Sequence, residues 1–327
     1  MPRRLTNDLL LALSIALVAT GLAGWALPVA QVSPLYDVHR ALGVGVLLIL
    51  VWKQAVVRGS LRWRWGRDGS IRWGILAGVG LLVCLATGLA WTLNVVSFEA
   101  LWGYSPLNIH TGIGVALLPL VGWHLLHRMS SNFGGGPVLG RRAALRGAGL
   151  LLASLVGWQL VERTAALNPT RLATGSKHAG SFSGNRYPTT IWLADSVPKL
   201  DLGSWRLRVG GRVDTPAVLS YADLTGYPAR QVQAVLDCTS GWWSEQVWTG
   251  YRLRDLLQPG AGAREIAVQS VTGHRIVVPL DELEGALLVT HVGGEALTAE
   301  HGFPVRLALP GRRGYQWVKW VSRVEVL

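Results

Sequence analysis

Two histidines occupy equivalent positions of an internal repeat and could bind one metal between them. A Ser-Pro-Leu motif precedes both His39 and His110, and a tryptophan follows each histidine after thirteen residues. One imidazole from each copy of a duplicated helical hairpin suits the ligation of a haem iron, and this predicts an electron carrier. The alternative is that both histidines lie at a membrane surface and hydrogen-bond headgroups or backbone. The other matching residues are Ser33, Pro34, Leu35, Gly43 and Trp52 in the first copy, Ser105, Pro106, Leu107, Gly114 and Trp123 in the second, and the upstream runs 19–23 and 86–90.

A third histidine could bind a second haem deeper in the same helices. His124 follows His110 by fourteen residues, which is four helical turns and roughly 21 Å along the same face. Its counterpart in the first copy is Lys53, whose ammonium group is a poor iron ligand. We therefore expect one haem b and keep His124 as a candidate ligand of a second. The alternative for His124 and His127 is a polar boundary facing the cytoplasm, near a quinone pocket.

The two cysteines of the chain differ in their surroundings. Cys84 lies within an apolar stretch, which indicates a small packing residue. Cys238 follows a β-rich run and precedes an aromatic turn at residues 239–243. An unpaired thiol outside the cytoplasm is a liability unless it binds a metal, and a soft thiolate suits a high-valent one. Because no second cysteine or histidine pair accompanies Cys238, zinc is not expected; the metal's other ligands must come from a cofactor.

The first half of the chain contains the elements that must hold the histidines. Half of all residues are hydrophobic, and a bilayer-spanning helix needs about 20 mostly apolar residues. We predict five membrane helices, with His39 and His110 opening the second and fourth. The uncharged stretches are residues 9–32, 41–52, 73–98, 109–126 and 147–161.

The basic residues that give the chain its net charge of +12 are distributed unevenly between the predicted loops. The basic residues gather before the first helix, between the second and third, and between the fourth and fifth, and alternate loops carry almost none. This positive-inside pattern predicts a multi-pass protein of the cell (inner) membrane, with a cytoplasmic N-terminus and an extracytoplasmic, periplasmic C-terminal domain. It also excludes nucleic acid as the partner that explains the charge.

The fifth apolar stretch follows paired arginines. Arg141 and Arg142, then a hydrophobic residue and Arg146, precede a weak apolar core. The pattern resembles a twin-arginine export signal, which carries folded domains across a membrane. The alternative is a simple anchor with a basic inner flank. In either case no convincing cleavage site follows, so the segment is expected to remain as an anchor.

Composition changes to that of a soluble domain near residue 168. We divide the chain into a four-helix transmembrane domain (1–135), a fifth helix with linker (136–170) and an α+β domain (171–327). Alternating apolar residues from Trp205 to Val213 predict a strand. Further strands are expected at residues 232–236, 266–271, 276–278 and 305–309, and helices at 253–257 and 281–288.

Several segments of the second half resemble the sulfite oxidase family of molybdopterin enzymes. They include Leu236-Asp237-Cys238 with the later Trp248-Thr249-Gly250-Tyr251, and His301-Gly302-Phe303-Pro304-Val305-Arg306-Leu307 with Gly314-Tyr315-Gln316-Trp317-Val318-Lys319-Trp320. The first half is similar to four-helix membrane cytochrome b subunits that anchor periplasmic oxidoreductases. The expected fold is therefore a cytochrome b-like bundle with a fifth anchor helix, followed by an α+β molybdopterin-binding domain.

The resemblance implies a set of cofactor ligands. Cys238 would ligate molybdenum, together with the dithiolene of molybdopterin. Arg306 and Lys319 match positions that bind the pterin phosphate. Further cofactor contacts are implied for Trp317 and Val318 through their backbone, for His301, and more weakly for Asn185 and Ser270.

Two departures from sulfite oxidases bear on the substrate. Their immunoglobulin-like second domain has no counterpart before Leu327, and Trp242 and Trp243 occupy the region where those enzymes carry sulfite-binding arginines. An aromatic pocket suits a small neutral molecule, as in the periplasmic methionine sulfoxide reductase branch. We therefore expect a membrane-anchored enzyme that passes electrons from quinol through haem to molybdenum and reduces an S-oxide or N-oxide. The alternatives are a sulfite-type dehydrogenase that feeds quinone, and a haem electron-transfer protein or sensor with a metal-free C-terminal domain.

Overall fold

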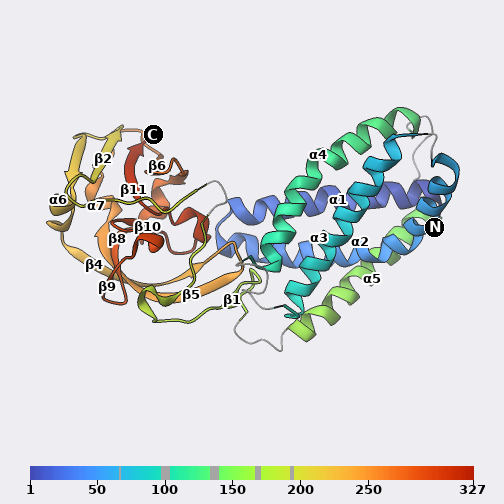
Figure 1. Cartoon of the computed structure of the whole chain (residues 1–327), viewed down its shortest axis with the longest axis horizontal. Coiled ribbons are helices and arrows are strands. Elements are labelled where there is room, and N and C mark those ends of the chain that lie inside the picture. The colour runs from blue at the N-terminus through green and yellow to red at the C-terminus, as the bar shows by residue number, and fades with distance from the viewer. Residues whose placement is uncertain (66–67, 97–103, 133–139, 166–170, 192–194) are drawn as a thin grey trace. The chain divides into compact units, whose positions relative to one another are not determined.

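Five long helices make up the first part of the chain (Figure 1). The computed structural model describes residues 1–65, 68–96, 104–132, 140–165, 171–191 and 195–327. Within these residues the chain divides into two compact units, Met1–Gly175 and Ser176–Leu327. The helices of the first unit are α1 (Arg3–Ala26), α2 (Val29–Arg64), α3 (Ser70–Thr92), α4 (Pro106–Asn132) and α5 (Arg141–Ala165).

The helices pack as two hairpins and an added helix. α1 packs on α2, α3 packs on α4, and α5 packs on α2. A small apolar core joins the first hairpin to α5, because Leu13, Val46, Ile49 and Leu150 are all buried together. The pairing of consecutive helices follows from the repeat, since each copy contributes one hairpin.

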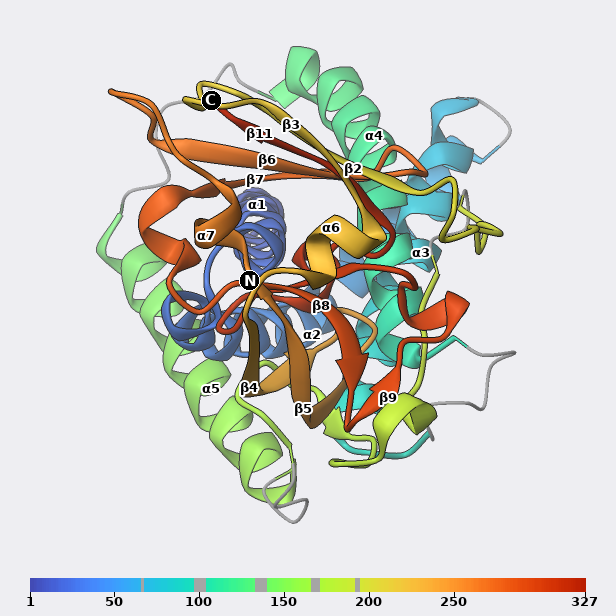
Figure 2. The ribbon, with the colours of Figure 1, turned by 90° about the vertical axis from the view of Figure 1, so that its left-hand side faces the viewer.

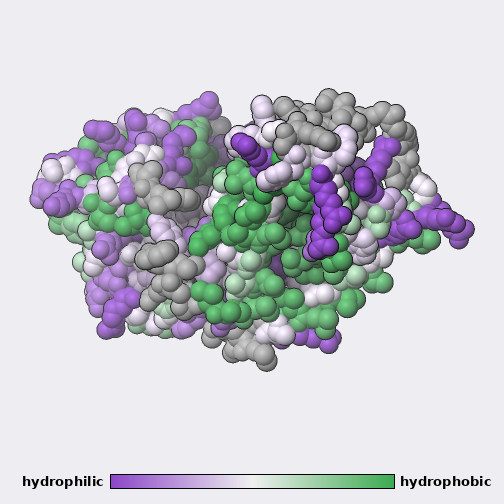
Figure 3. Space-filling view, turned by 45° about the vertical axis from the view of Figure 1, so that its right-hand side comes forward, coloured by the Kyte–Doolittle hydropathy of each residue, from purple (hydrophilic) through white to green (hydrophobic). Residues whose placement is uncertain are grey.

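All five helices are long and apolar enough to cross a membrane. Their outward side chains are largely apolar: Ile15 on α1 and Leu152 on α5, for example, are 60% and 64% exposed. Figure 3 shows a broad hydrophobic surface over these helices. Large exposed apolar surfaces mark contact with a partner or lipid, and the length of these helices fits a membrane protein.

The two histidine helices begin differently, which corrects the expectation that His39 opens its helix. α2 starts at Val29, so His39 lies ten residues inside it and Pro34 is an internal proline. α4 starts at Pro106, four residues before His110. The Ser105 hydroxyl accepts a hydrogen bond from the Asn108 N–H at 3.1 Å, and the Asn108 side chain accepts one from the Ser105 N–H. This reciprocal cap fixes the start of α4.

The second unit is built on two sheets. The six-stranded sheet has the order β1-β5-β8-β10, with β4 on β5 and β9 on β8; the five-stranded sheet has the order β3-β2-β11-β6-β7. In Figure 2 the five-stranded sheet crosses the upper part of this unit, and β4, β5, β8 and β9 lie below it. The strands are β1 (Lys177–His178), β2 (Arg206–Gly211), β3 (Ala217–Ser220), β4 (Ala229–Asp237), β5 (Trp242–Arg252), β6 (Glu265–Ser270), β7 (Arg275–Pro279), β8 (Leu287–Val292), β9 (Glu295–Ala296), β10 (Arg306–Ala308) and β11 (Val321–Val326).

Alternation of inward and outward side chains explains these strands. In β2 Leu207 and Val209 are buried while Arg206 and Arg208 are exposed, as period-two patterning requires. In β5 the inward positions include Trp242 and Trp248, both buried. The helices of this unit are short: α6 (Tyr221–Thr225), α7 (Leu253–Leu256) and the 3-10 turns η1 (Gly184–Arg186), η2 (Leu280–Leu283), η3 (Ala299–His301) and η4 (Gly314–Gln316).

Two local predictions in this unit are wrong. The helix expected at residues 281–288 is the turn η2 followed by strand β8, whose residues are almost all buried. A continuous apolar run has no periodicity that separates a buried strand from a helix. The aromatic turn expected to reach Trp243 ends at Gly241, where φ is +93°, and Trp242 already begins β5.

Candidate functional site

His39 on α2 and His110 on α4 face each other. Their ring centroids are 6.0 Å apart and the ring planes are nearly perpendicular, at 84°. The repeat therefore brings its two imidazoles to one place.

Each imidazole uses its Nδ1 atom to contact the preceding helix. His110 Nδ1 lies 2.8 Å from the Cys84 carbonyl oxygen on α3, which can only accept, so this nitrogen carries the proton. His39 Nδ1 lies 2.9 Å from the Thr20 hydroxyl on α1. Because Thr20 donates its own proton to the Ala16 carbonyl at 2.8 Å, it accepts from His39. Both rings are thus in the tautomer that leaves the Nε2 lone pair available to a metal.

A glycine of the preceding helix supports each ring. A Cβ atom on Gly21 would meet the His39 ring at 3.4 Å, and a Cβ on Gly88 would meet His110 Nδ1 at 2.8 Å. Gly43 and Gly114, four residues after the histidines, would meet nothing within 4 Å. The repeated glycines therefore let the rings pack closely on one side and leave open space on the other.

The inner positions of the repeat differ from the outer ones. Lys53, the counterpart of His124, donates a hydrogen bond to the Asn7 side chain at 2.9 Å. The side chains of His124 and His127 lie outside the described residues. The second-haem hypothesis stays a prediction.

Cys238 lies in the turn of the β4–β5 hairpin. Its N–H donates to the Trp242 carbonyl at 2.8 Å, and its carbonyl accepts from the Gly241 N–H at 3.0 Å. The residue is 8% exposed. The turn therefore fixes the backbone of the one cysteine in this unit.

Thr190 joins three of the residues around the thiol. Its hydroxyl lies 3.7 Å from Cys238 Sγ and 3.3 Å from the Trp242 indole nitrogen. Its carbonyl accepts a hydrogen bond from Lys319 Nζ at 3.2 Å. Nothing in the sequence marks Thr190, because it belongs to an irregular segment and its contacts arise only from the fold.

Arg306 is a buried cation with unused hydrogen-bonding capacity. It is 3% exposed, and its Nε atom has no partner among the described residues. One terminal nitrogen donates to the Tyr187 hydroxyl at 3.3 Å and to the His301 carbonyl at 3.2 Å. In the part of the chain that the structure describes, no carboxylate pairs with this guanidinium. A buried unpaired charge is costly, so the site suits an anionic ligand.

Lys319 lies beside Arg306 and completes the positive site. Burial, and then the charge of Arg306, lower the pKa of the Lys319 ammonium group to about 7. Gly302, at a φ of +113°, lies between the two residues and lets them approach each other, because a Cβ there would lie 3.1 Å from Arg306 Cβ and 3.3 Å from Lys319 Cα. A phosphate bound by both cations would favour the protonated lysine again.

A chain of hydrogen bonds links His301 to Asn185. The Thr298 hydroxyl lies 2.6 Å from His301 Nδ1, and the Thr298 N–H donates to the Asn185 side-chain oxygen. His301 Nε2 lies 3.0 Å from the Tyr187 carbonyl. Burial lowers the pKa of His301 and raises that of Tyr187 to about 12. Asn185 therefore holds the loop of His301, and its NH2 group is bonded to the Ala296 carbonyl at 2.8 Å.

Of the remaining predicted cofactor residues, Trp317 and Val318 directly precede Lys319 in the chain, and Ser270 is linked to its surroundings by hydrogen bonds. Trp317 and Val318 are both buried; the Trp317 ring lies 5.2 Å from that of Trp248, and the Val318 carbonyl accepts from the Leu307 N–H. The Ser270 hydroxyl bonds the Thr272 hydroxyl at 3.0 Å. Thr272 in turn donates to Asp195, one of the charges near Lys319.

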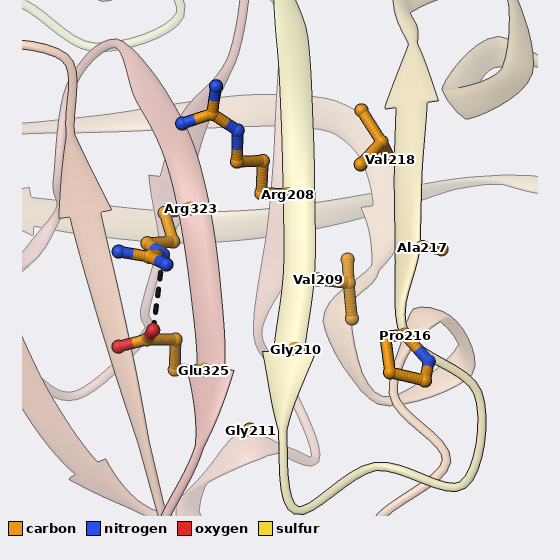
Figure 4. Close-up of a pocket in the computed structure, with 9 residues that line it drawn as sticks. All are labelled: Arg208, Val209, Gly210, Gly211, Pro216, Ala217, Val218, Arg323 and Glu325. Carbon is orange, nitrogen blue, oxygen red and sulfur yellow. Dashed lines mark ion pairs between the residues drawn. The ribbon is translucent and has the colours of Figure 1, made fainter.

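A separate pocket of about 240 Å³ lies on strands β2, β3 and β11. Figure 4 shows Arg208 on β2 and Arg323 on β11, with Arg323 turned toward Glu325. Arg323 Nε is 3.1 Å from the Glu325 carboxylate. None of the predicted site residues lines this pocket, so it is no part of the candidate active site.

Comparison with known proteins identifies the second unit. Residues 194–327 match the family model of the oxidoreductase molybdopterin binding domain. An uncharacterized oxidoreductase of Bacillus subtilis (strain 168), YuiH, is 33% identical over 161 residues, which cover 46% of this chain and 81% of that protein. The chain belongs to the molybdopterin-binding oxidoreductases of the sulfite oxidase family.

Larger members of the family match over the same part of the chain. Rat mitochondrial sulfite oxidase is 31% identical over 165 residues, covering 40% of this chain and 30% of that enzyme. A nitrate reductase [NAD(P)H] of Hordeum vulgare is 30% identical over 168 residues, covering 40% of this chain and 19% of that enzyme. The chain is therefore an oxidoreductase with a molybdopterin-binding domain, and it spans less than a third of either larger relative.

Proposed function

We propose that the protein is a membrane-anchored molybdenum oxidoreductase that exchanges electrons between quinol, a haem b and a molybdenum centre on Cys238. In the proposed direction it reduces a small S-oxide or N-oxide. The observation that carries the proposal is the pair of opposed imidazoles in a chain that also contains a molybdopterin-binding domain. One haem held between the two copies of the repeat would give that domain an electron source.

The residues around His39 and His110 fit a haem. Metal–imidazole nitrogen bonds are about 2 Å long, so rings on opposite sides of one metal have centroids roughly 6 Å apart; the observed 6.0 Å agrees. Both Nδ1 atoms are held by the protein and both Nε2 atoms are available. Haem would supply one-electron transfer. The chain would contribute His39 and His110 as ligands of the iron, and the open space beside Gly43 and Gly114.

The residues around Cys238 fit a molybdopterin. The buried Arg306 lacks a partner at Nε and lies beside Lys319, as a phosphate site requires. Trp248 and Trp317 lie 5.7 and 6.0 Å from the guanidinium and fix its plane. When bound, the cofactor supplies two-electron oxygen-atom chemistry. The chain would supply the Cys238 thiolate and the phosphate-binding cations Arg306 and Lys319.

The side chains nearest the thiol favour a neutral substrate. Trp242 and Thr190 contact the region of Cys238. The nearby Arg313 is bound to Asp237 in a buried ion pair. With Arg306 and Lys319 assigned to the pterin, the described residues that contact Cys238 and Trp242 offer no further cation for a substrate dianion. Sulfoxides and N-oxides present one polar oxygen on a small apolar body, which suits indole and threonine contacts.

The membrane arrangement of the proposal places the sheet unit outside the cytoplasm. The basic residues before α1 and between α2 and α3 support a cytoplasmic N-terminus, and Arg141 and Arg142 are both exposed at the start of α5. Export through a twin-arginine signal rests on these two residues. Replacing both with glutamine should leave the C-terminal unit protected from protease added to spheroplasts, in which the wild-type unit is digested.

The full-length protein in detergent tests the electron path. We expect bound molybdenum, a haem b spectrum, reduction of the haem by a quinol analogue, and its reoxidation by dimethyl sulfoxide or methionine sulfoxide. Cys238→Ser should abolish reoxidation and keep the haem spectrum. Protein without haem would overturn the electron path, and haem that sulfite reduces but no sulfoxide reoxidises would reverse its direction.

The reverse direction has support from one relative. Sulfite oxidase matches the second unit at 31% identity, so oxidation of sulfite with delivery of electrons to quinone is the second candidate. Haem reduction by sulfite in the absence of quinol distinguishes it.

A further inference from the structure

A buried ion pair lies directly beside the cysteine of the candidate active site. Arg313 Nη1 is 2.7 Å from the Asp237 carboxylate, and the two side chains are 3% and 4% exposed. Asp237 is the last residue of β4 and precedes Cys238; Arg313 precedes η4. The two residues also form a parallel β-bridge, so both backbone and side chains join them.

The same arginine reaches the backbone of the cysteine. Arg313 Nη2 donates to the Cys238 carbonyl at 3.3 Å. The Ser176 hydroxyl approaches the other Asp237 carboxylate oxygen at 2.5 Å and the Cys238 carbonyl at 3.4 Å. The Gly241 N–H donates to the same carbonyl at 3.0 Å. Two donors therefore bind this oxygen, and Ser176, whose one proton goes to Asp237, lies beside it.

The segment that carries Arg313 is pressed against Cys238. A Cβ atom on Gly314 would lie 3.0 Å from Cys238 Cα and 3.2 Å from the Asp237 carbonyl. The close approach is possible only because residue 314 is a glycine. Movement of this segment would therefore move Cys238 with it.

We propose that Asp237, Arg313 and Ser176 form a brace that positions the Cys238 thiolate for the metal. The inference rests on the proposed role of Cys238 as a molybdenum ligand. A buried ion pair adds little to stability compared with an apolar pair of the same size. Its bond to the carbonyl of a metal-binding residue gives it a reason to be there, because groups that hold a ligand orient that ligand. Asp237, Arg313 and Ser176 are thus positioning residues that act through Cys238.

The adjacent arginine provides a matched control. Arg312 pairs with Glu282 through two hydrogen bonds, at 2.6 and 2.5 Å. Neither side chain has a bond to Cys238 among the described contacts. Arg312→Gln removes an ion pair of similar kind from the same turn and leaves the brace intact.

The test uses full-length holoprotein and four measurements: molybdenum per chain, the sulfur-to-metal charge-transfer absorption, kcat with KM, and the melting temperature. Asp237→Asn and Arg313→Gln should shift the charge-transfer band and lower kcat by roughly tenfold or more, with little change in KM. Arg313→Lys keeps the charge and loses the forked contact, so its band should lie between those of wild type and Arg313→Gln. Arg312→Gln should lower the melting temperature and leave band and kcat unchanged.

Ser176→Ala keeps the inference testable if the charge variants do not fold. It removes one hydroxyl and no charge, and should shift the band in the same direction by a smaller amount. An unshifted band in folded Ser176→Ala and Arg313→Lys would overturn the brace. Cys238→Ser should remove the part of the absorption that arises from the cysteine thiolate and leave that of the dithiolene sulfurs; a spectrum that Cys238→Ser leaves unchanged would overturn the proposed metal ligand, and the brace with it.

Discussion

The two helical hairpins carry the same histidine but hold it in different ways. In the first, His39 lies within a long α2 and bonds a side-chain hydroxyl, that of Thr20. In the second, His110 lies near the capped start of α4 and bonds a backbone carbonyl, that of Cys84. Thr87, the repeat counterpart of Thr20, donates to carbonyls of its own helix. Both copies thus have the histidine and the supporting glycine, while the hydrogen-bond acceptor differs.

The difference determines which of the two histidines can lose a hydrogen-bond acceptor by mutation. A carbonyl belongs to every residue type, so no substitution of Cys84 removes the acceptor of His110. His39 contacts the hydroxyl of Thr20 and also the backbone of Leu17, and of these two partners only the hydroxyl can be deleted. The first copy is therefore the more mutable side of the proposed haem site.

Loss of either histidine should have the largest effect. His39→Ala and His110→Ala should each abolish the same haem b absorption, because one iron needs both ligands. Absorption spectra of the reduced protein measure this. His291→Ala, a histidine of β8, is the control and should keep the spectrum. A full haem spectrum in either helix variant would show that the two histidines do not bind the same iron.

Adding a methyl group to the supporting glycines should act unequally. In Gly88→Ala the new Cβ would meet His110 Nδ1 at 2.8 Å, whereas in Gly21→Ala it would meet His39 at 3.4 Å, an ordinary contact. We expect Gly88→Ala to cost about 1–3 kcal/mol through overpacking and to lower haem content, and Gly21→Ala to cost less. Haem content per chain and melting temperature measure both effects. Equal losses in the two variants would show that the two rings are packed equally tightly against their glycines.

Removing the hydroxyl acceptor should weaken only the first copy. Thr20→Val keeps the shape of the side chain and removes the hydroxyl acceptor at His39 Nδ1, so the imidazole donates less to the iron. We expect a higher haem reduction potential and roughly tenfold weaker haem binding. The matched control is Thr87→Val, whose hydroxyl bonds no histidine. A redox titration in which both variants shift alike would contradict the assigned asymmetry.

Removing the thiol beside His110 should have the smallest effect. Cys84 Sγ lies 3.4 Å from His110 Nδ1, but the carbonyl of residue 84 is the closer acceptor and persists in Cys84→Ala. The haem potential should therefore shift less than in Thr20→Val. The same redox titration checks this, and a larger shift would make the thiol the principal acceptor.

The sequence pointed to the candidate ligands, which stay predictions, but not to the residues that contact them. The repeat identified His39 and His110 because equal spacing survives in the chain itself. Thr20 and Thr190 could not be identified, since their contacts depend on how α1 packs against α2 and on where an irregular segment runs. The motif around Arg306 and Lys319 pointed to an anion site, but the conformation of Gly302 that brings the two cations together has no signal in composition or spacing.

The fold of the second unit was predicted in part for similar reasons. Strands with clear alternation, such as β2, were found at their observed places. The helix predicted at residues 281–288 extended into the start of β8 (Leu287–Val292), because the apolar run of β8 is buried on both faces and carries no period. Arg313 and Asp237 were missed as a pair, since 75 residues of chain separate Arg313 from the Cys238 carbonyl that it contacts.

The order of strands in the five-stranded sheet constrains when this unit can fold. β11 lies between β2 and β6, and pairs in parallel with β2, which leaves the ribosome more than a hundred residues earlier. β2 must wait for that partner, so the sheet closes only after translation of the whole unit. A chaperone that binds this unit during translation therefore meets an incomplete sheet, and a cofactor that binds at Lys319, just before β11, could be loaded only after that segment is made.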